Sequence, residues 1–289
     1  MQSIGVIIGN RNFFPDHLVT EARKDVLALF KELQLNPIMV SDSETKLGGV
    51  ETLTEARKCA ELFKAHQDEI EGVLVVLPNF GDEKGVAHAI RESGLQCPVL
   101  VQAYPDDLSK LGPGLRRDGF CGKISVCNNL NQFGIPFSLT TQHVTALDSD
   151  SFRADLDKFL AVCRVVDKMK SVRLGAVGAR PDAFNTVRFS EKILERHGIS
   201  VTPVDLSEIF ASIAKLKDDD SRVSDELESI KSYASTRLIA KDRLTSMAKL
   251  GVVLRDWTAE NQIDALAFQC WTSIQKNIGV NPCTVMSML

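Results

Sequence analysis

The 289-residue chain lacks any segment of the kind that directs a protein into or across a membrane. Its first residues, MQSIGVIIGNRNFF, have no basic lead and only a short apolar core, so they do not read as a signal peptide. No stretch approaches the ~20 consecutive apolar residues that a membrane-spanning helix needs. We therefore expect a cytoplasmic protein with no membrane partner.

Runs of basic residues are also missing. The chain has 34 Lys and Arg against 38 Asp and Glu, which gives a formal net charge of -4 at pH 7. Proteins that bind nucleic acid usually present a cluster of Lys and Arg, so we expect no nucleic-acid partner. The remaining composition, 44% hydrophobic and 25% charged, is that of an ordinary globular protein.

Several catalytic and metal-binding signatures are absent. The five histidines include no i, i+4 pair, and the seven cysteines include no C-x-x-C pair, so the sequence predicts no zinc site. No P-loop, no G-x-S-x-G and no H-E-x-x-H occurs. The cysteines are odd in number and irregular in spacing, and we interpret most of them as reduced, buried thiols.

Short apolar runs alternate with amphipathic segments along the whole chain. Strands separated by helical segments are typical of a parallel sheet covered by helices. A long amphipathic helix at 148–169 separates two such series, so the sequence predicts an α/β protein with one domain over 1–169 and a second over 170–289. The predicted strands are 3–8, 37–40, 72–77, 98–102, 136–139, 172–177, 199–203, 265–268 and 283–286. The other predicted helices include 15–33, 51–66, 86–92 and 184–197.

The two halves of the chain begin in a similar way. IGVIIGNRNFFPDH and LGAVGARPDAFNT each run from a strand through glycine and arginine to the start of a helix. The similarity is consistent with an internal duplication, and also with two ordinary strand-to-helix turns.

Polar side chains are concentrated where the predicted strands end. In an open α/β sheet, ligands bind beyond the carboxyl ends of the strands, which selects the loops 9–11, 78–84, 178–182 and 269–271. Amide and guanidinium groups there suit the hydroxyls of a small polar ligand, and an indole ring can lie against the apolar face of a sugar. Alternatively, the asparagines shape tight turns and the arginines pair with surface acids. The candidate substrate-binding residues are Asn10, Arg11, Asn79, Arg180, Asn185, Gln269 and Trp271.

Three parts of the chain resemble a known family. GARPDAFNTVRFSEKILERHGISVTPVDLSEIF (178–210) is similar to the start of the second domain of the L-fucose isomerase-like proteins, and ALAFQCWTSIQKNIGVNPCTVMSML (265–289) is similar to the segment that leads into their active site. VIIGNRNFFPDH, together with VLPNFGDEKG, is similar to their first domain. The resemblance covers essentially the whole chain. It implies two doubly wound parallel-sheet domains, a flavodoxin-like N-terminal domain and a Rossmann-like second domain.

The resemblance also implies an activity. These proteins, which resemble the L-arabinose isomerases too, interconvert aldoses and ketoses by moving a proton between C1 and C2 through an enediol. A divalent cation, with manganese expected, and two carboxylates are implied. In the family the first of these carboxylates follows the strand that corresponds to 283–289, and the Asp and His ligands come later. We therefore expect no catalytic or metal-binding residue in this chain, and we interpret it as the N-terminal part of a longer isomerase.

The contact residues of the family carry over to two positions. Gln269 corresponds to a substrate-binding Gln, which we expect at the carboxyl end of a central strand, and Arg11 lies near a sugar-contacting Arg in the first loop. The implied substrate is a pentose or a deoxyhexose. The first domain of such proteins reaches over the site of a neighbouring subunit, so a homo-oligomer, a trimer or a hexamer, is also implied. A different interpretation is a non-enzymatic sugar-binding or regulatory module, in which two α/β lobes close on a ligand.

Overall fold

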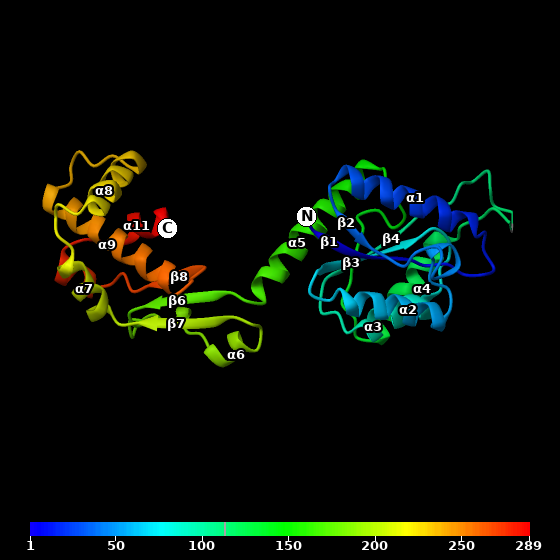
Figure 1. The fold of residues 1–289 in the computed structure, drawn as a ribbon, viewed down its shortest axis with the longest axis horizontal. Helices are drawn as coiled ribbons and strands as arrows, with labels where there is room; N and C mark the ends of the chain where they lie inside the picture. Colours follow the sequence, from blue (N-terminus) through cyan, green and yellow to red (C-terminus); the bar gives the residue numbers. More distant parts are fainter. Residues whose placement is uncertain (113) are drawn as a thin grey trace. The chain divides into compact units, whose positions relative to one another are not determined.

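The computed structural model describes residues 1–112 and 114–289. The chain forms two compact units, Met1–Asp167 and Lys168–Leu289, and Figure 1 shows that each contains a sheet of its own. The predicted α/β class is confirmed, because both sheets are parallel and helices alternate with the strands. Among the described residues, no helix is both long enough and apolar enough to span a bilayer.

The sheet of the first unit is parallel and five-stranded. Its strands are β1 (Ser3–Ile8), β2 (Asn36–Ile38), β3 (Ile70–Leu77), β4 (Val99–Ala103) and β5 (Ser138–Leu139). Their order, β2-β1-β3-β4-β5, is the doubly wound arrangement of flavodoxin-like domains. The inner strands β1 and β3 are apolar runs, SIGVII and IEGVLVVL, whose residues are almost all buried. That composition suits strands covered on both faces.

Helices cover both faces of this sheet (Figure 1). They are α1 (His17–Glu32), α2 (Leu53–Ala65), α3 (Glu83–Ser93), α4 (Gly119–Gln132) and α5 (Asp150–Met169), with a 3-10 turn η1 (Lys46–Gly48). One face packs on α1 and α5, where Phe30 is fully buried, and the other packs on α2, α3 and α4, where Phe63 is fully buried. At the start of α3, the carboxylate of Asp82 accepts a hydrogen bond from Gly85 N. The loop after β3 therefore turns directly into a capped helix.

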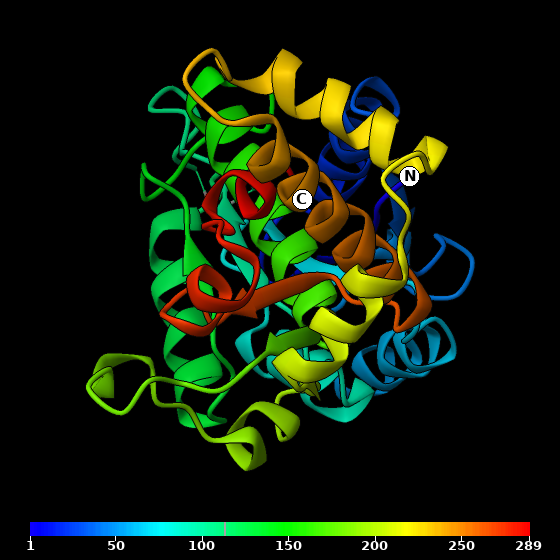
Figure 2. The same ribbon diagram turned by 90° about the vertical axis from the view of Figure 1, so that its left-hand side faces the viewer.

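The second unit contains a smaller parallel sheet of three strands. They are β6 (Arg173–Val177), β7 (Ser200–Val204) and β8 (Ala265–Phe268), in the order β7-β6-β8. The helices are α6 (Glu191–Glu195), α7 (Leu206–Lys215), α8 (Ser221–Tyr233), α9 (Lys241–Glu260), α10 (Ser273–Ile278) and α11 (Cys283–Met288), with a 3-10 turn η2 (Asn185–Val187). α7, α9, α10 and α11 share one core with the sheet, around Val177, Val204 and Leu254. Figure 2, in which this unit faces the viewer, shows α8 and α9 on the same side of the strands.

The segment 283–286 is helical, so the predicted strand there is wrong. It belongs to α11, which follows Pro282, a residue suited to the first turn of a helix. Val285 is fully buried in the core that includes α9, while Cys283 and Leu289 are exposed. Composition alone does not distinguish a helix from a strand in so short an apolar run. α11 thus contributes one fully buried side chain, Val285, to the core, whereas a strand would have buried every second residue.

The segment 184–197 is not one helix, as the sequence predicts, but the turn η2 followed by the short helix α6. Most helical stability in proteins comes from burying an apolar face against a neighbour. Here several apolar side chains keep much of their surface in solvent, so they add little packing that could stabilise a longer helix. Four of them are between 37% and 59% exposed: Phe184, Val187, Phe189 and Ile193.

All seven cysteines lie in the described part of the chain, and none of them forms a disulfide. The expectation that most of them are buried is wrong, because only Cys59 and Cys163 are buried. Burial raises the pKa of both of these thiols to about 12. They are therefore protonated and unreactive at neutral pH.

Candidate functional site

The first candidate site lies at the carboxyl ends of β1 and β3, where the strand order of the first unit reverses. Asn10 follows β1, and Asn79 follows β3. Asn79 Nδ2 donates a hydrogen bond to Asn10 Oδ1 at 2.7 Å, and Asn79 Oδ1 accepts one from Gly81 N at 3.0 Å. Asn10 is 1% exposed and Asn79 is 0% exposed. A buried pair of amides therefore ties the two loops together.

Two carboxylates and an ammonium group extend this network. Asn10 Nδ2 donates to Glu51 Oε2 at 2.7 Å and to Asp16 Oδ1 at 3.1 Å. Lys46 Nζ lies 2.9 Å from Asp16 Oδ1 and 3.5 Å from Glu51 Oε2. The hydrogen bond from Lys46 lowers the pKa of Asp16, and the same bond raises the pKa of Lys46. Asp16 and Lys46 therefore stay charged near neutral pH, and the ammonium group bridges the two carboxylates.

Arg11 packs against the loop that follows β3. Its Nε donates to Gly81 O at 2.9 Å, and its Nη2 lies 2.6 Å from Glu83 Oε2. The guanidinium carbon is 4.5 Å from the centre of the Phe80 ring, which is a cation–π arrangement. Ser125 Oγ donates to the same Glu83 oxygen at 2.6 Å. A carboxylate, a carbonyl and a ring thus fix the direction of the Arg11 side chain.

Three predicted site residues, Asn10, Arg11 and Asn79, therefore belong to one set of linked loops. The amides of Asn10 and Asn79 are bonded within the protein and present almost no surface to a ligand, which matches the alternative in which asparagines shape the turns. Arg11 is half-buried and paired with Glu83, which matches the alternative in which arginines pair with acids. A sugar contact by any of the three stays a prediction.

A second set of cationic and aromatic side chains lies beside this network, and it is not predicted from the sequence. Phe14 stacks on Phe80 with ring centres 5.9 Å apart, and the guanidinium carbon of Arg116 lies 5.7 Å from the centre of the Phe14 ring. Arg116 comes from the long loop after β4, and its buried Nε has no acceptor in the part of the chain that the structure describes. The signal that points to it is the pair Arg116 and Arg117 in a loop that follows a buried strand.

The second candidate site lies at the carboxyl ends of β6 and β8. Gln269 follows β8; its Oε1 accepts from Ala179 N at 2.8 Å, and its Nε2 donates to Trp271 O at 3.1 Å. Gly178 permits this close approach, because it has a φ of +80° and a Cβ there would lie 2.8 Å from Gln269 Cβ. Gln269 therefore joins the loop after β6 to the loop after β8. β8 is an edge strand, so the expected position at the end of a central strand is wrong.

Arg180 and Gln269 line one cavity of about 230 Å³ at this end of the sheet. Most of the remaining lining is apolar and includes Phe189. Trp271 is 57% exposed, so its indole is accessible to a sugar face. Asn185 is exposed in η2. The structure thus brings Arg180, Gln269 and Trp271 into neighbouring loops, while their contact with a ligand stays a prediction.

The residues that the structure describes do not fit a divalent cation. They contain no group of three or more His, Cys, Asp or Glu side chains that could hold a metal ion. Asp16 and Glu51 lie near each other, but the ammonium group of Lys46 bridges them. Hard cations need several oxygen ligands, so no metal-dependent step is assigned to these side chains.

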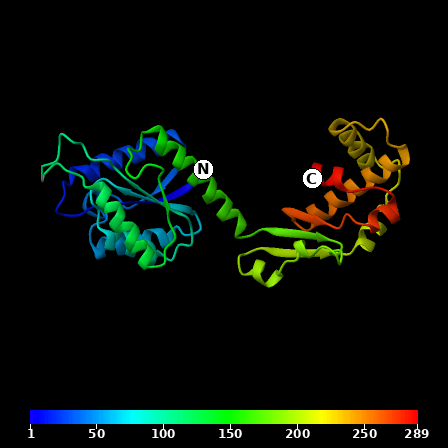
Figure 3. The same cartoon turned by 180° about the vertical axis from the view of Figure 1, so that it is seen from behind.

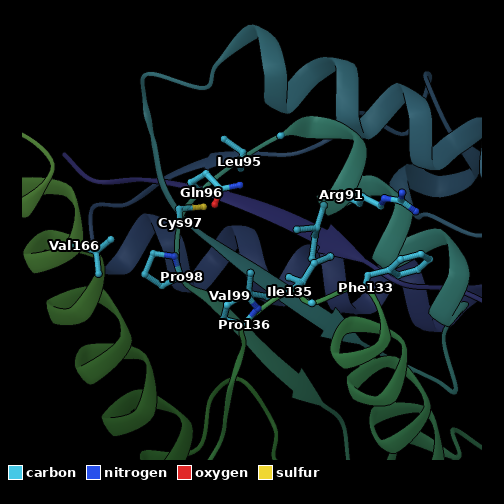
Figure 4. Close-up of a pocket in the computed structure, with 13 residues that line it drawn as sticks. Arg91, Leu95, Gln96, Cys97, Pro98, Val99, Phe133, Ile135, Pro136 and Val166 are labelled. Atoms are coloured by element: carbon cyan, nitrogen blue, oxygen red, sulfur yellow. The ribbon is translucent and has the colours of Figure 1, made fainter. Parts of the chain in front are cut away.

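A cavity of about 420 Å³ opens at the opposite edge of the first sheet (Figure 4). It lies beside the amino end of β4, where α3 and α4 end, and its lining includes Arg91, Cys97, Phe133 and Val166. None of the predicted site residues lines it. Ligands of doubly wound sheets bind at the carboxyl edge, so no ligand is assigned to this cavity.

Comparison with known proteins identifies the family. A family model described as "Fucose/sulfoquinovose isomerase, N-terminal domain" matches residues 5–170. The sulfoquinovose isomerases of Priestia aryabhattai and Priestia megaterium are each 25% identical to the chain over 195 residues, and that of Alkalicoccus urumqiensis is 23% identical over 193 residues. These matches cover 66% of this chain but only about two fifths of the length of each relative. Because the family model covers more than half of the chain, the chain belongs to the fucose/sulfoquinovose isomerase family, the L-fucose isomerase-like family that its sequence resembles.

Proposed function

We propose that this chain is part of a metal-dependent sugar ketol isomerase of the L-fucose and L-arabinose isomerase type. The observation that carries the proposal is the match of residues 5–170, which include Asn10, Arg11 and Asn79, to an isomerase N-terminal domain. In the proposed reaction a base removes the C2 proton of an aldose while O1 gains a proton, which gives an enediol. A proton is then delivered to C1 and O2 loses its proton, which gives the ketose with no net change in composition.

The proposed substrate is a small aldose, a pentose or a deoxyhexose. The curated relatives are named sulfoquinovose isomerases. Sulfoquinovose is a deoxyhexose that carries a sulfonate, so a sulfonated sugar is the first candidate within this class. The guanidinium groups of Arg11 and Arg180 suit an anionic group, the amide of Gln269 can serve two sugar oxygens, and Trp271 suits the apolar face of the ring.

The proposed cofactor is a divalent cation, with Mn²⁺ first, as the family resemblance implies. The described side chains offer no suitable group of ligands, so the ligands would come from other polypeptide of the isomerase. The proposed assembly is a homo-oligomer, a trimer or a hexamer, in which the first unit reaches over the site of a neighbouring subunit. In that arrangement Arg11 would contact a sugar bound by the neighbour.

An isomerase assay in D2O tests the proposal. The 289-residue chain and the full product of its gene would each be incubated with Mn²⁺ and with sulfoquinovose, L-fucose or L-arabinose. The full product should form a ketose that carries deuterium at C1, detected by NMR, because the enediol takes its proton from solvent. The 289-residue chain should give none. Calorimetric sugar binding without turnover by either protein would identify a sugar-binding module and would reject the isomerase.

A further inference from the structure

The sheet of the second unit packs its core on one face and is only partly covered on the other. The strand register places Gly175, Val177 and Val204 on the side of α7 and α9. Alternate residues of a strand point to the opposite face. The six side chains there, which we call the open face, are all apolar and either half-buried or exposed: Leu174, Ala176, Val201, Pro203, Ala265 and Ala267.

The open face is incompletely covered. Parallel sheets normally bury both faces, as the sheet of the first unit does. On the open face lies the excursion between β6 and β7, which contains η2 and α6 (Figure 3). Val187 and Phe189 of this excursion line the 230 Å³ cavity together with Ala176 and Ala267. The excursion thus leaves space above the strands and keeps much of its own apolar surface in solvent.

The two edges of this sheet differ in their chemistry. β7 carries Pro203, which has no N–H donor and is typical of an edge that receives no further strand. β8 has the sequence ALAF, with no proline, lysine or other charge to discourage pairing. The β8 edge therefore lacks the features that discourage pairing with a further strand.

We propose that the open face and the β8 edge form a docking surface for a further α/β stretch of the isomerase. That stretch would add a strand beside β8 and lay an apolar helix on the open face. The relatives have enough sequence to supply it: the 195 matched residues are 41% of the Priestia aryabhattai enzyme, so that enzyme exceeds this chain by well over a hundred residues. The docking surface rests on the proposal that the chain is part of a longer isomerase, but it does not depend on which sugar that isomerase converts.

Two matched variants test whether the open face is exposed. Ala265→Lys places a charge on the open face, and Ala259→Lys places the same charge on the last turn of α9, outside it. Both alanines are exposed, so both variants should keep the unfolding midpoint of the wild type. The neutral dye Nile red should fluoresce with the wild type and with Ala259→Lys, and at least twofold less with Ala265→Lys. Absence of dye binding by the wild type would contradict an open face.

A binding experiment tests the occupant. The probe is the carboxyl-terminal part of the Priestia aryabhattai enzyme, beyond the portion equivalent to this chain, added as a separate polypeptide. The wild type and Ala259→Lys should bind it in calorimetry and show slower hydrogen exchange at β8, while Ala265→Lys should bind at least tenfold more weakly. Equal binding by the two variants, or none by the wild type, would overturn the proposal. Self-association that Ala265→Lys abolishes would assign the face to a second copy of the chain, which also overturns it.

Discussion

Replacing Asn79 by alanine tests whether the buried amide pair holds the loops of the first candidate site. Asn79 is fully buried, and its amide makes two hydrogen bonds, from Nδ2 to Asn10 Oδ1 and from Gly81 N to Oδ1. Asn79→Ala removes both partners at once. A carbonyl oxygen on Asn10 and an N–H group on Gly81 then remain without them.

The size of the effect follows from these two groups. A buried polar group without a partner costs about 1–3 kcal/mol. Two such groups should lower the free energy of unfolding by about 2–5 kcal/mol. The upper value is below twice the single-group maximum because a water molecule that enters the vacated space can bond to one of the unpaired groups. The total stability of a domain is about 5–15 kcal/mol. The loss should therefore be a large and measurable fraction of the free energy of unfolding of the first unit.

Urea unfolding followed by circular dichroism measures this loss. Asn131→Ala is the control, because Asn131 is an exposed residue of α4 and should change the free energy of unfolding by no more than about 0.5 kcal/mol. Asn79→Asp keeps an acceptor for Gly81 N but removes the donor to Asn10 and buries a charge, so it should be no more stable than Asn79→Ala. A loss for Asn79→Ala as small as that of the control would refute the reasoning.

Three further changes probe other parts of the chain. Gly122→Ala should lower the free energy of unfolding of the first unit by about 3 kcal/mol, measured by thermal unfolding. A Cβ at this position would overlap the backbone oxygen of Phe80, and a gain of about 1 kcal/mol in helix propensity does not offset that overlap. Burial lowers the pKa of Lys123 from 10.5 to about 8, so the unfolded chain binds more protons between these pH values and the wild-type stability rises with pH there. Relative to Lys123→Met, the wild type should gain about 3 kcal/mol over that interval, measured by urea unfolding at each pH. Gln269→Ala in the full-length isomerase should lower kcat/KM roughly ten- to hundredfold with little change in the unfolding midpoint. Unchanged kinetics would leave Gln269 with a structural role only.

The elements of the first unit follow closely from the sequence because its inner strands are uniformly apolar. SIGVII and GVLVVL show no helical period, and a glycine or a proline ends each run. The loops after these strands, and with them Asn10 and Asn79, could therefore be located in advance. Their pairing could not, because the two asparagines are 69 residues apart and neither segment contains a signal for the other.

Two segments of the second unit show where a local pattern fails. CTVMSM has no charge and no turn residue, so its sequence resembles that of a strand. In the structure it is helical, and Val285 packs in the core that includes α9. The sequence of 184–197 predicts one helix, but several of its apolar side chains stay largely exposed and bury too little surface to stabilise one. Both outcomes are decided by what lies across the core from the segment, and that information is not local.

The two candidate sites differ in what they leave available to a ligand. Asn10 and Asn79 could meet a sugar only after buried hydrogen bonds were broken, at about 1–3 kcal/mol for each group left unpaired. The guanidinium of Arg11 and the indole of Trp271 keep exposed surface and need no such rearrangement. The conformation of the loop after β1 depends on the amide pair, and the direction of Arg11 depends on that loop. The asparagines thus hold the two loops together, and among the three predicted contact residues at this edge Arg11 is the one that keeps exposed surface.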